Sequence, residues 1–119
     1  MRSDNERLSD IIESCDLITD FVRDISSLAR LAQNRRDQSA LLYELIKIGE
    51  AATHISREIQ EAHPHISWAG IKNLRNIIVH QYSGVDWDIV WQVVTVRVPE
   101  LRKDIQRIID GLQGSEAAS

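Results

Sequence analysis

The sequence predicts an all-α fold, a four- to five-helix up-and-down bundle. Apolar residues recur every three to four positions over long stretches, and no stretch alternates apolar and polar residues as a strand does. Only five Gly and two Pro occur, too few turn residues to separate the short strands of a β-sandwich. A chain of 119 residues forms one domain whose core needs no metal or disulfide.

The first helix is expected to begin after Asp4, which we interpret as its N-cap, and to end near Ile25. Ser26 and Ser27 are expected to cap a short turn of helix in the connector that follows, which extends to Arg36. The apolar side of the first helix is formed by Leu8, Ile11, Ile12, Cys15, Ile18, Val22 and Ile25.

A second long helix is expected over residues 37–62, and Pro64 cannot continue it. Gly49, with Ala on the positions that follow, places small residues in the middle of this helix, where we expect another helix to approach closely. Tyr43 is expected to be half-buried. The apolar side is formed by Leu41, Leu42, Leu45, Ile48, Ala52, Ile55 and Ile59.

Ser67 is a suitable N-cap for a third helix over residues 68–80, and Asp86 for a fourth. Pro99 is expected to kink or restart the fourth helix. Gly residues at 111 and 114 are expected to end the last helix. We therefore expect one helical domain over residues 1–113 and a disordered tail over 114–119.

Charge and cysteine content limit the possible functions. The 14 basic and 18 acidic side chains give a net charge of −4, which argues against coating nucleic acid by bulk charge but allows a small basic site. Cys15 is the only cysteine and is expected to be a buried apolar residue, which suits a reducing compartment. No apolar run approaches the roughly 20 residues that span a bilayer, and no signal peptide is recognisable, so we expect a cytoplasmic protein without a membrane partner.

Polar residues suited to chemistry gather at the end of the third helix. Asn76 and His80 are one turn apart on the same side of an ideal helix, and the long side chain of Arg75 can reach toward His80. Tyr82 follows at the helix end. From spacing alone, a structural hydrogen-bonding His and a surface Arg remain the simpler interpretation.

The segment also resembles a known family. Arg75, His80 and Tyr82 match the Arg-x4-His-x-Tyr signature of the HepT-like toxins of the HEPN superfamily. The flanking segments are similar too, among them Ile48-Gly49-Glu50-Ala51-Ala52, Ile66-Ser67-Trp68 and the Trp87 segment before Val98-Pro99. The resemblance covers essentially residues 5–112.

This resemblance implies a homodimeric helical bundle and a metal-independent endoribonuclease that uses no cofactor. His80 would move the proton of a ribose 2′-hydroxyl or of the leaving 5′-oxygen. Arg75 would hold the scissile phosphate and offset the charge of the transition state, and Asn76 would position His80 or the phosphate. The catalytic residues are therefore expected to be Arg75, Asn76 and His80.

The resemblance also implies a partner, a minimal nucleotidyltransferase similar to MntA, which would silence the toxin by transferring AMP to Tyr82. An adenylylated phenol would place a negative phosphate where the RNA phosphate must lie. The alternative for Tyr82 is simple packing over the helix end. The alternative for the whole chain is a non-catalytic module that binds a nucleotidyltransferase or RNA.

Other polar groups are weaker candidates. His63 and His65 have a metal-like spacing but no completing ligand nearby in the sequence, so we interpret them as loop residues. Glu50 and His54 are interpreted as a solvated hydrogen-bonded pair. Arg35-Arg36 and a basic stretch of the last helix could guide RNA or form solvated faces; that stretch comprises Arg97, Arg102, Lys103 and Arg107.

Overall fold

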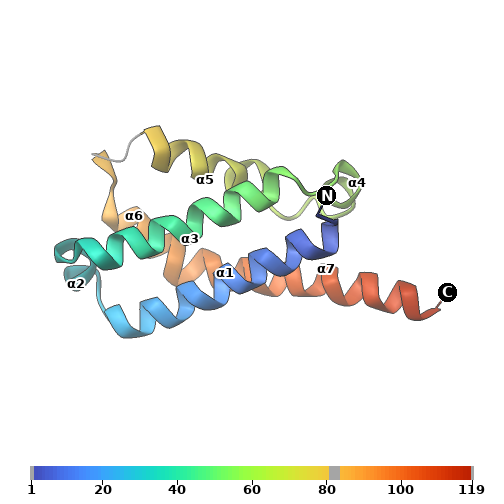
Figure 1. The fold of residues 1–119 in the computed structure, drawn as a ribbon, viewed down its shortest axis with the longest axis horizontal. Helices are drawn as coiled ribbons and strands as arrows, with labels where there is room; N and C mark the ends of the chain where they lie inside the picture. The colour runs from blue at the N-terminus through green and yellow to red at the C-terminus, as the bar shows by residue number, and fades with distance from the viewer. Residues whose placement is uncertain (1, 81–83, 119) are drawn as a thin grey trace.

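The computed structural model describes the backbone of residues 2–80 and 84–118, and the side chains of 2–74 and 84–114. This described part is helical, without a strand, so the all-α prediction is confirmed (Figure 1). None of its helices is long and apolar enough to cross a membrane. The elements in chain order are α1 (Asp4–Ile25), α2 (Leu28–Gln33), α3 (Arg35–Thr53), α4 (Arg57–Ala62), α5 (Trp68–His80), α6 (Trp87–Gln92), the π-helix η2 (Val93–Arg97) and α7 (Val98–Ala118).

The long helices run alternately up and down the molecule, which measures 52 × 27 × 26 Å (Figure 1). Helix α3 is central, because it packs against α1 on one side and α5 on the other, while α7 covers α1. Gly49 and its neighbours Ala51 and Ala52 are buried on α3, as expected for a site of close helix approach. The largest fully buried apolar side chains are Leu8, Ile11, Ile18, Leu31, Leu41, Leu45, Ile48, Val94 and Ile105.

The caps of α1 differ by one residue from the prediction. Ser3, not Asp4, is the N-cap: its side chain accepts the backbone N–H of Glu6, and the Glu6 carboxylate accepts the N–H of Ser3. The sequence Ser-x-x-Glu favours this reciprocal capping box over a cap at Asp4. At the other end, Ser26 has a left-handed φ of 69°, and Ser27 caps α2, which confirms the short helix in the connector.

The predicted second helix is wrong in its length, because it is two helices. Helix α3 begins earlier, at Arg35 after the N-cap Asn34, and ends at Thr53. Ser56 has extended backbone angles and caps α4 through a hydrogen bond from Ile59 N–H. The N–H of Ser56 donates to Asp4 Oδ1 at 2.9 Å instead of to a helical carbonyl. A contact across 52 residues thus interrupts a pattern that is locally helical.

The later boundaries mostly agree with the prediction. Helix α5 covers the expected residues 68–80, and Asp86 caps α6 by accepting the N–H groups of Asp88 and Ile89. The sequence predicts a kink or restart at Pro99, and the structure has a π-helix over the residues just before it. A π-helix has a wider turn than an α-helix, and Pro99 has no N–H to donate to a helical carbonyl. The expected end at Gly111 or Gly114 is wrong, since α7 continues to Ala118; glycine lowers helix stability by about 1 kcal/mol without ending a helix. The domain boundary at residue 113 stays a prediction.

Candidate active site

The start of α5 is fixed by side-chain contacts with the segment that precedes it. The indole N–H of Trp68, a buried residue, donates to the His63 carbonyl at 3.0 Å. Lys72 Nζ donates to Gln60 Oε1 of α4 at 2.8 Å. Ile71 packs against the core with its side chain partly buried. These contacts set the direction of the helix that ends with the predicted catalytic residues.

The predicted catalytic residues occupy the last two turns of α5. The backbone of Arg75, Asn76 and His80 is helical, so Asn76 and His80 stand one turn apart as expected. Arg75 and His80 are about 7.5 Å apart along the axis of an α-helix. The side chains of these three residues, and Tyr82 as a whole, lie outside the described residues. Their roles therefore stay predictions.

Several elements meet at the end of the bundle where α5 finishes. Figure 1 shows the end of α5, the start of α3, α2 and α6 together at the left-hand end of the molecule. Helix α2 packs against both α3 and α6. The α2–α3 junction at this end of the bundle carries the exposed residues Arg35 and Arg36.

An apolar groove of about 200 Å³ runs beside the motif helix. Its floor is formed by Leu45 and Ile48 of α3. One wall is α5, with Ile71 and Leu74, so the groove reaches the residue just before Arg75. The other wall belongs to η2 and α7, and comprises Val93, Val98 and Leu101, with the charged residues Arg97, Glu100 and Asp104.

Charged groups between α1 and α3 are balanced within the molecule. Glu44 is a buried carboxylate, 5% exposed, and its Oε1 lies 3.1 Å from Lys47 Nζ. Desolvation lowers the pKa of Lys47, but the hydrogen bond and charge of Glu44 outweigh it, so the pKa is raised overall. Glu50 and His54 form the expected hydrogen bond of 3.2 Å between half-exposed side chains.

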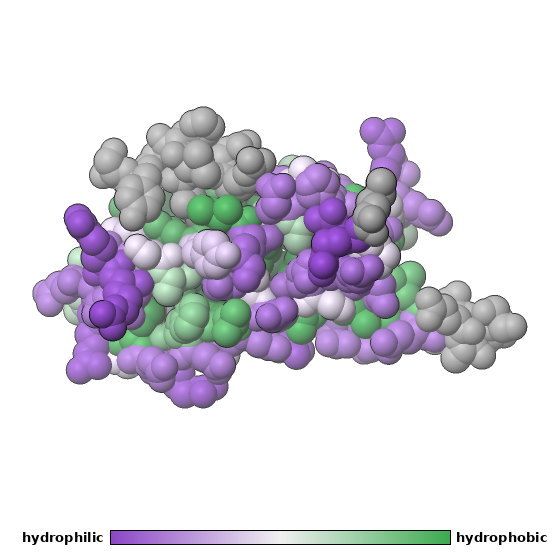
Figure 2. All heavy atoms as spheres, viewed as in Figure 1, coloured by the Kyte–Doolittle hydropathy of each residue, from purple (hydrophilic) through white to green (hydrophobic). Residues whose placement is uncertain are grey.

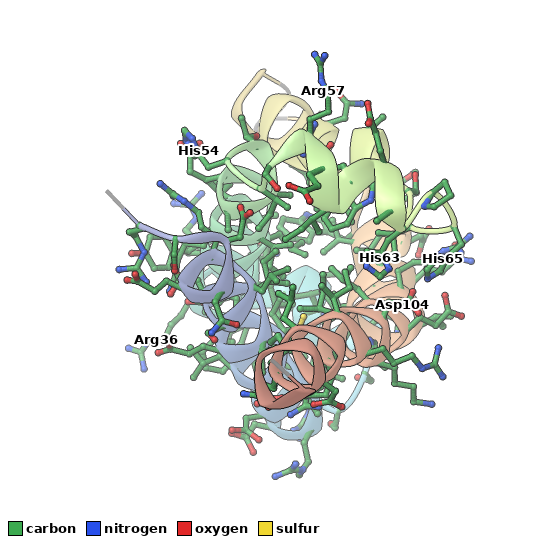
Figure 3. All side chains as sticks on the ribbon, turned by 90° about the vertical axis from the view of Figure 1, so that its right-hand side faces the viewer. Arg36, His54, Arg57, His63, His65 and Asp104 are labelled. Atoms are coloured by element: carbon green, nitrogen blue, oxygen red, sulfur yellow. The ribbon has the colours of Figure 1, made fainter. Side chains whose placement is uncertain are left out.

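The loop histidines His63 and His65 lie with their ring centroids 6.0 Å apart, edge to face. His65 Nε2 lies 4.0 Å from Asp104 Oδ1, which Arg107 also contacts at 3.5 Å (Figure 3). Within the described residues, no group of three or more His, Cys, Asp or Glu side chains could hold a metal ion.

The basic stretch of η2 and α7 is largely neutralised by neighbouring carboxylates. Arg102 Nε donates to Asp16 Oδ1 of α1 at 2.6 Å. Arg97 contacts Glu100 at 3.7 Å, and Arg107 contacts Asp104 at 3.5 Å. This pattern favours the interpretation of the stretch as a solvated face.

Tyr43 departs from the expectation of half-burial, because its side chain is 61% exposed on α3. The sequence carried a signal for this exposure. Arg36, Tyr43 and Lys47 are spaced by seven and four residues, which places them on one side of a helix, away from the buried side of α3.

Comparison with known proteins decides the family. The family described as "Ribonuclease HepT-like" matches residues 11–108, which is most of the chain. The chain belongs to the HepT-like family. This membership, within the HEPN superfamily, confirms the resemblance derived from the sequence.

Curated relatives of this HepT-like chain match over nearly their full length. A protein of Methanocaldococcus jannaschii named "Putative RNase" is 30% identical over 94% of this chain and 92% of its own. A second protein of that organism with the same name is 32% identical over 83% of this chain and 90% of its own. A protein of Thermococcus cleftensis named "Probable ribonuclease HepT" is 32% identical over 90% of this chain and 96% of its own. The comparison with solved structures finds no match.

Proposed function

We propose that this HepT-like chain is a metal-independent endoribonuclease and the toxin of a toxin–antitoxin pair. Membership in a ribonuclease family is the observation that carries the proposal. The helical backbone of residues 75–80 supports it, because this backbone presents Arg75, Asn76 and His80 within two turns at one end of the bundle.

The chemistry assigned to these residues needs no cofactor. His80 accepts the proton of the ribose 2′-hydroxyl as the oxygen attacks the adjacent phosphorus, or donates one to the leaving 5′-oxygen. Arg75 binds the scissile phosphate and offsets its growing negative charge, while Asn76 orients the imidazole or the phosphate. One His80 serves poorly as base and acid in the same step, so a second copy that supplies its own His80 completes the proposal.

The apolar groove beside α5 is the surface that we assign to this second copy. Two exposed apolar side chains, Ile89 at 59% and Val96 at 47%, stand on α6 and η2, and η2 also carries the groove residues Val93 and Arg97. A two-fold axis would let these side chains of one copy enter the groove of the other. The rim is self-complementary in charge, since Arg97 stands beside Glu100 and Asp104 on the same face.

Tyr82 is the proposed site of control. In the proposal, a minimal nucleotidyltransferase partner transfers AMP to the Tyr82 hydroxyl, releasing pyrophosphate from ATP. The added phosphate then repels the RNA phosphate at Arg75. Mass spectrometry after co-expression with the nucleotidyltransferase should show the mass of AMP on Tyr82, and an unmodified Tyr82 would contradict this part of the proposal.

The catalytic assignment is tested by RNA cleavage in the presence of EDTA. The wild-type chain should cleave single-stranded RNA, His80→Ala should lose about 100-fold or more of the rate, and Arg57→Ala should cleave like wild type. Arg57 is the matched control because it is exposed on α4, at the opposite end of the bundle (Figure 3). Cleavage by His80→Ala at the wild-type rate, or no cleavage by any variant, would favour the non-catalytic module.

A further inference from the structure

The solvent side of α3 carries an aromatic ring between cations. Tyr43 has the most exposed side chain among the large apolar residues of the described part, at 61%. Arg36 precedes it by seven residues, which is two turns or about 10 Å along a helix. Lys47 follows by one turn, with Nζ 5.1 Å from the centre of the Tyr43 ring. We call Arg35, Arg36 and Tyr43 the α3 stripe.

The arginines of the α3 stripe differ from those of η2 and α7 in their electrostatic environment. Within the described residues, neither Arg35 nor Arg36 has a carboxylate within ion-pair distance, whereas Arg97, Arg102 and Arg107 each have one. Both side chains are exposed at the start of α3, and Figure 3 shows Arg36 projecting away from the bundle. Their positive charge is therefore available to a ligand.

Helix stability does not explain these two cations. The N-terminal end of a helix carries a partial positive charge, so arginine there is unfavourable by a few tenths of a kcal/mol. Asp37 is the one acidic residue in the first turn of α3, and its side chain is partly buried. Two arginines and the helix dipole together produce a local positive potential on a chain whose net charge is −4.

The α3 stripe and the proposed catalytic residues belong to neighbouring helices. The stripe begins at the end of the bundle where α5 finishes, and α3 packs directly against α5 (Figure 1). Figure 2 shows hydrophilic and hydrophobic side chains side by side in the view of Figure 1. The acidic residues Asp10 and Glu13 of α1 line a hollow together with Lys47 of α3. Along α3, the next exposed acidic group is Glu50, beyond Lys47 and already hydrogen-bonded to His54.

We propose that the α3 stripe binds the single-stranded RNA substrate. A base stacks on the exposed Tyr43 ring, while Arg35 and Arg36 contact phosphates of the same strand. Exposed aromatic rings combined with cations are the features by which proteins hold single strands without reading their sequence. The proposal rests on the ribonuclease function and names the residues outside the catalytic set that hold its substrate.

Binding is measured on the full-length chain with His80→Ala, so that the RNA is not consumed. The probe is a short, fluorescently labelled single-stranded RNA of mixed sequence, followed by anisotropy at several salt concentrations. Tyr43→Ala should weaken binding about tenfold, and Tyr43→Phe should bind like its parent because the ring is retained. Arg35→Ala/Arg36→Ala should weaken binding and lower the slope of log K against log salt by about 1.4. Arg57→Ala is the control and should leave both affinity and slope unchanged.

The variants should fold like the parent, because the four substituted side chains, those of Arg35, Arg36, Tyr43 and Arg57, are exposed. Circular dichroism verifies their folding. Equal binding by Tyr43→Ala, the double arginine variant and the Arg57 control would overturn the proposal, as would absence of measurable binding by the parent. Double-stranded RNA is a further probe, because its paired bases cannot stack on the Tyr43 ring. If Tyr43→Ala weakened the binding of double-stranded RNA as much as that of single-stranded RNA, the proposal would also be overturned. If the wild-type chain fails to cleave RNA but this binding pattern is found, the ribonuclease function is wrong and the α3 stripe stands. If the wild-type chain cleaves RNA but the variants bind RNA equally well, the ribonuclease function stands and the role of the α3 stripe is wrong.

Discussion

Asp4 and Ser56 join the start of α1 to the break between α3 and α4. Oδ1 of Asp4 accepts the backbone N–H of Ser56 at 2.9 Å, and the bond is partly buried. Helix α3 ends at Thr53, and the N–H of Ser56 is bonded to α1 instead of to a helical carbonyl. The pair therefore holds the break between α3 and α4 against the start of α1.

Removal of this acceptor should destabilise the fold. Asp4→Ala should lower the free energy of unfolding by about 1–2 kcal/mol, since it leaves a partly buried N–H without its partner. Asp4→Asn keeps an oxygen at the same position and should cost less than half as much. Asn5→Ala, on the exposed neighbouring position, is the control. Urea unfolding measures all three, and equal values for Asp4→Ala and Asn5→Ala would contradict the role of the bond.

The same pair shows where sequence reasoning reaches its limit. Residues 37–62 have continuous helical periodicity, and the break inside them combines a local cap at Ser56 with an acceptor 52 positions away. Ser3, Ser27 and Asp86 are caps that act within three residues, so the sequence alone could locate them or place them one residue off. Local hydrogen bonds are predictable from spacing, whereas a bond between distant segments needs the folded chain.

Burial of Cys15 predicts a thiol that reacts only after unfolding. Desolvation raises its pKa from 9.0 to about 12, and the charge of Asp16 adds to the rise while Arg102 opposes it. Because the thiolate is the nucleophile, a disulfide reagent at pH 8 should modify Cys15 at the rate of unfolding. Modification that is complete within seconds under native conditions would contradict the burial.

The raised pKa of Cys15 also predicts a pH dependence of stability. The unfolded chain loses the thiol proton above about pH 9, whereas the native chain keeps it until about pH 12. Stability from this group is therefore complete below pH 9 and falls between pH 9 and 12, by at most about 1.4 kcal/mol per pH unit. Cys15→Ala should have a shallower decline over this range in urea unfolding. Parallel curves for the two chains would show that Cys15 does not titrate in this way.

Trp68 should determine how firmly α5 is held. Trp68→Phe keeps most of the buried ring but removes the donor to the His63 carbonyl, which should cost about 1–2 kcal/mol. Amide hydrogen exchange of residues 71–74 should accelerate more than that of α1. Trp87→Phe on α6 is the control, because no hydrogen bond of its indole is found in the described part of the chain. Unchanged exchange in α5 would mean that packing alone positions this helix.

The family was predictable from the sequence because its resemblance rests on several motifs in order along the chain, among them Arg75, His80 and Tyr82 within eight consecutive residues. The roles of these three residues stay predictions. The groove was not predictable, and the α3 stripe only in part, from the spacing of Arg36, Tyr43 and Lys47 on one side of a helix. The groove residues come from α3, α5, η2 and α7, which only the packing of α5 beside α3 brings together. The exposure of Tyr43 depends likewise on which side of α3 the neighbouring helices cover.

The groove surface leads to a prediction about assembly. Val96→Glu places a charge on an exposed position of η2, the helix that also carries groove residues, so the monomer should fold while the proposed dimer loses an apolar contact. Tyr43→Glu is the matched control, because it adds the same charge to an exposed apolar side chain of a different helix, α3. Light scattering should give a dimer for wild type and Tyr43→Glu, and a monomer for Val96→Glu. Cleavage should fall with dissociation if each site needs the second His80, and a dimeric Val96→Glu chain would exclude this surface as the interface.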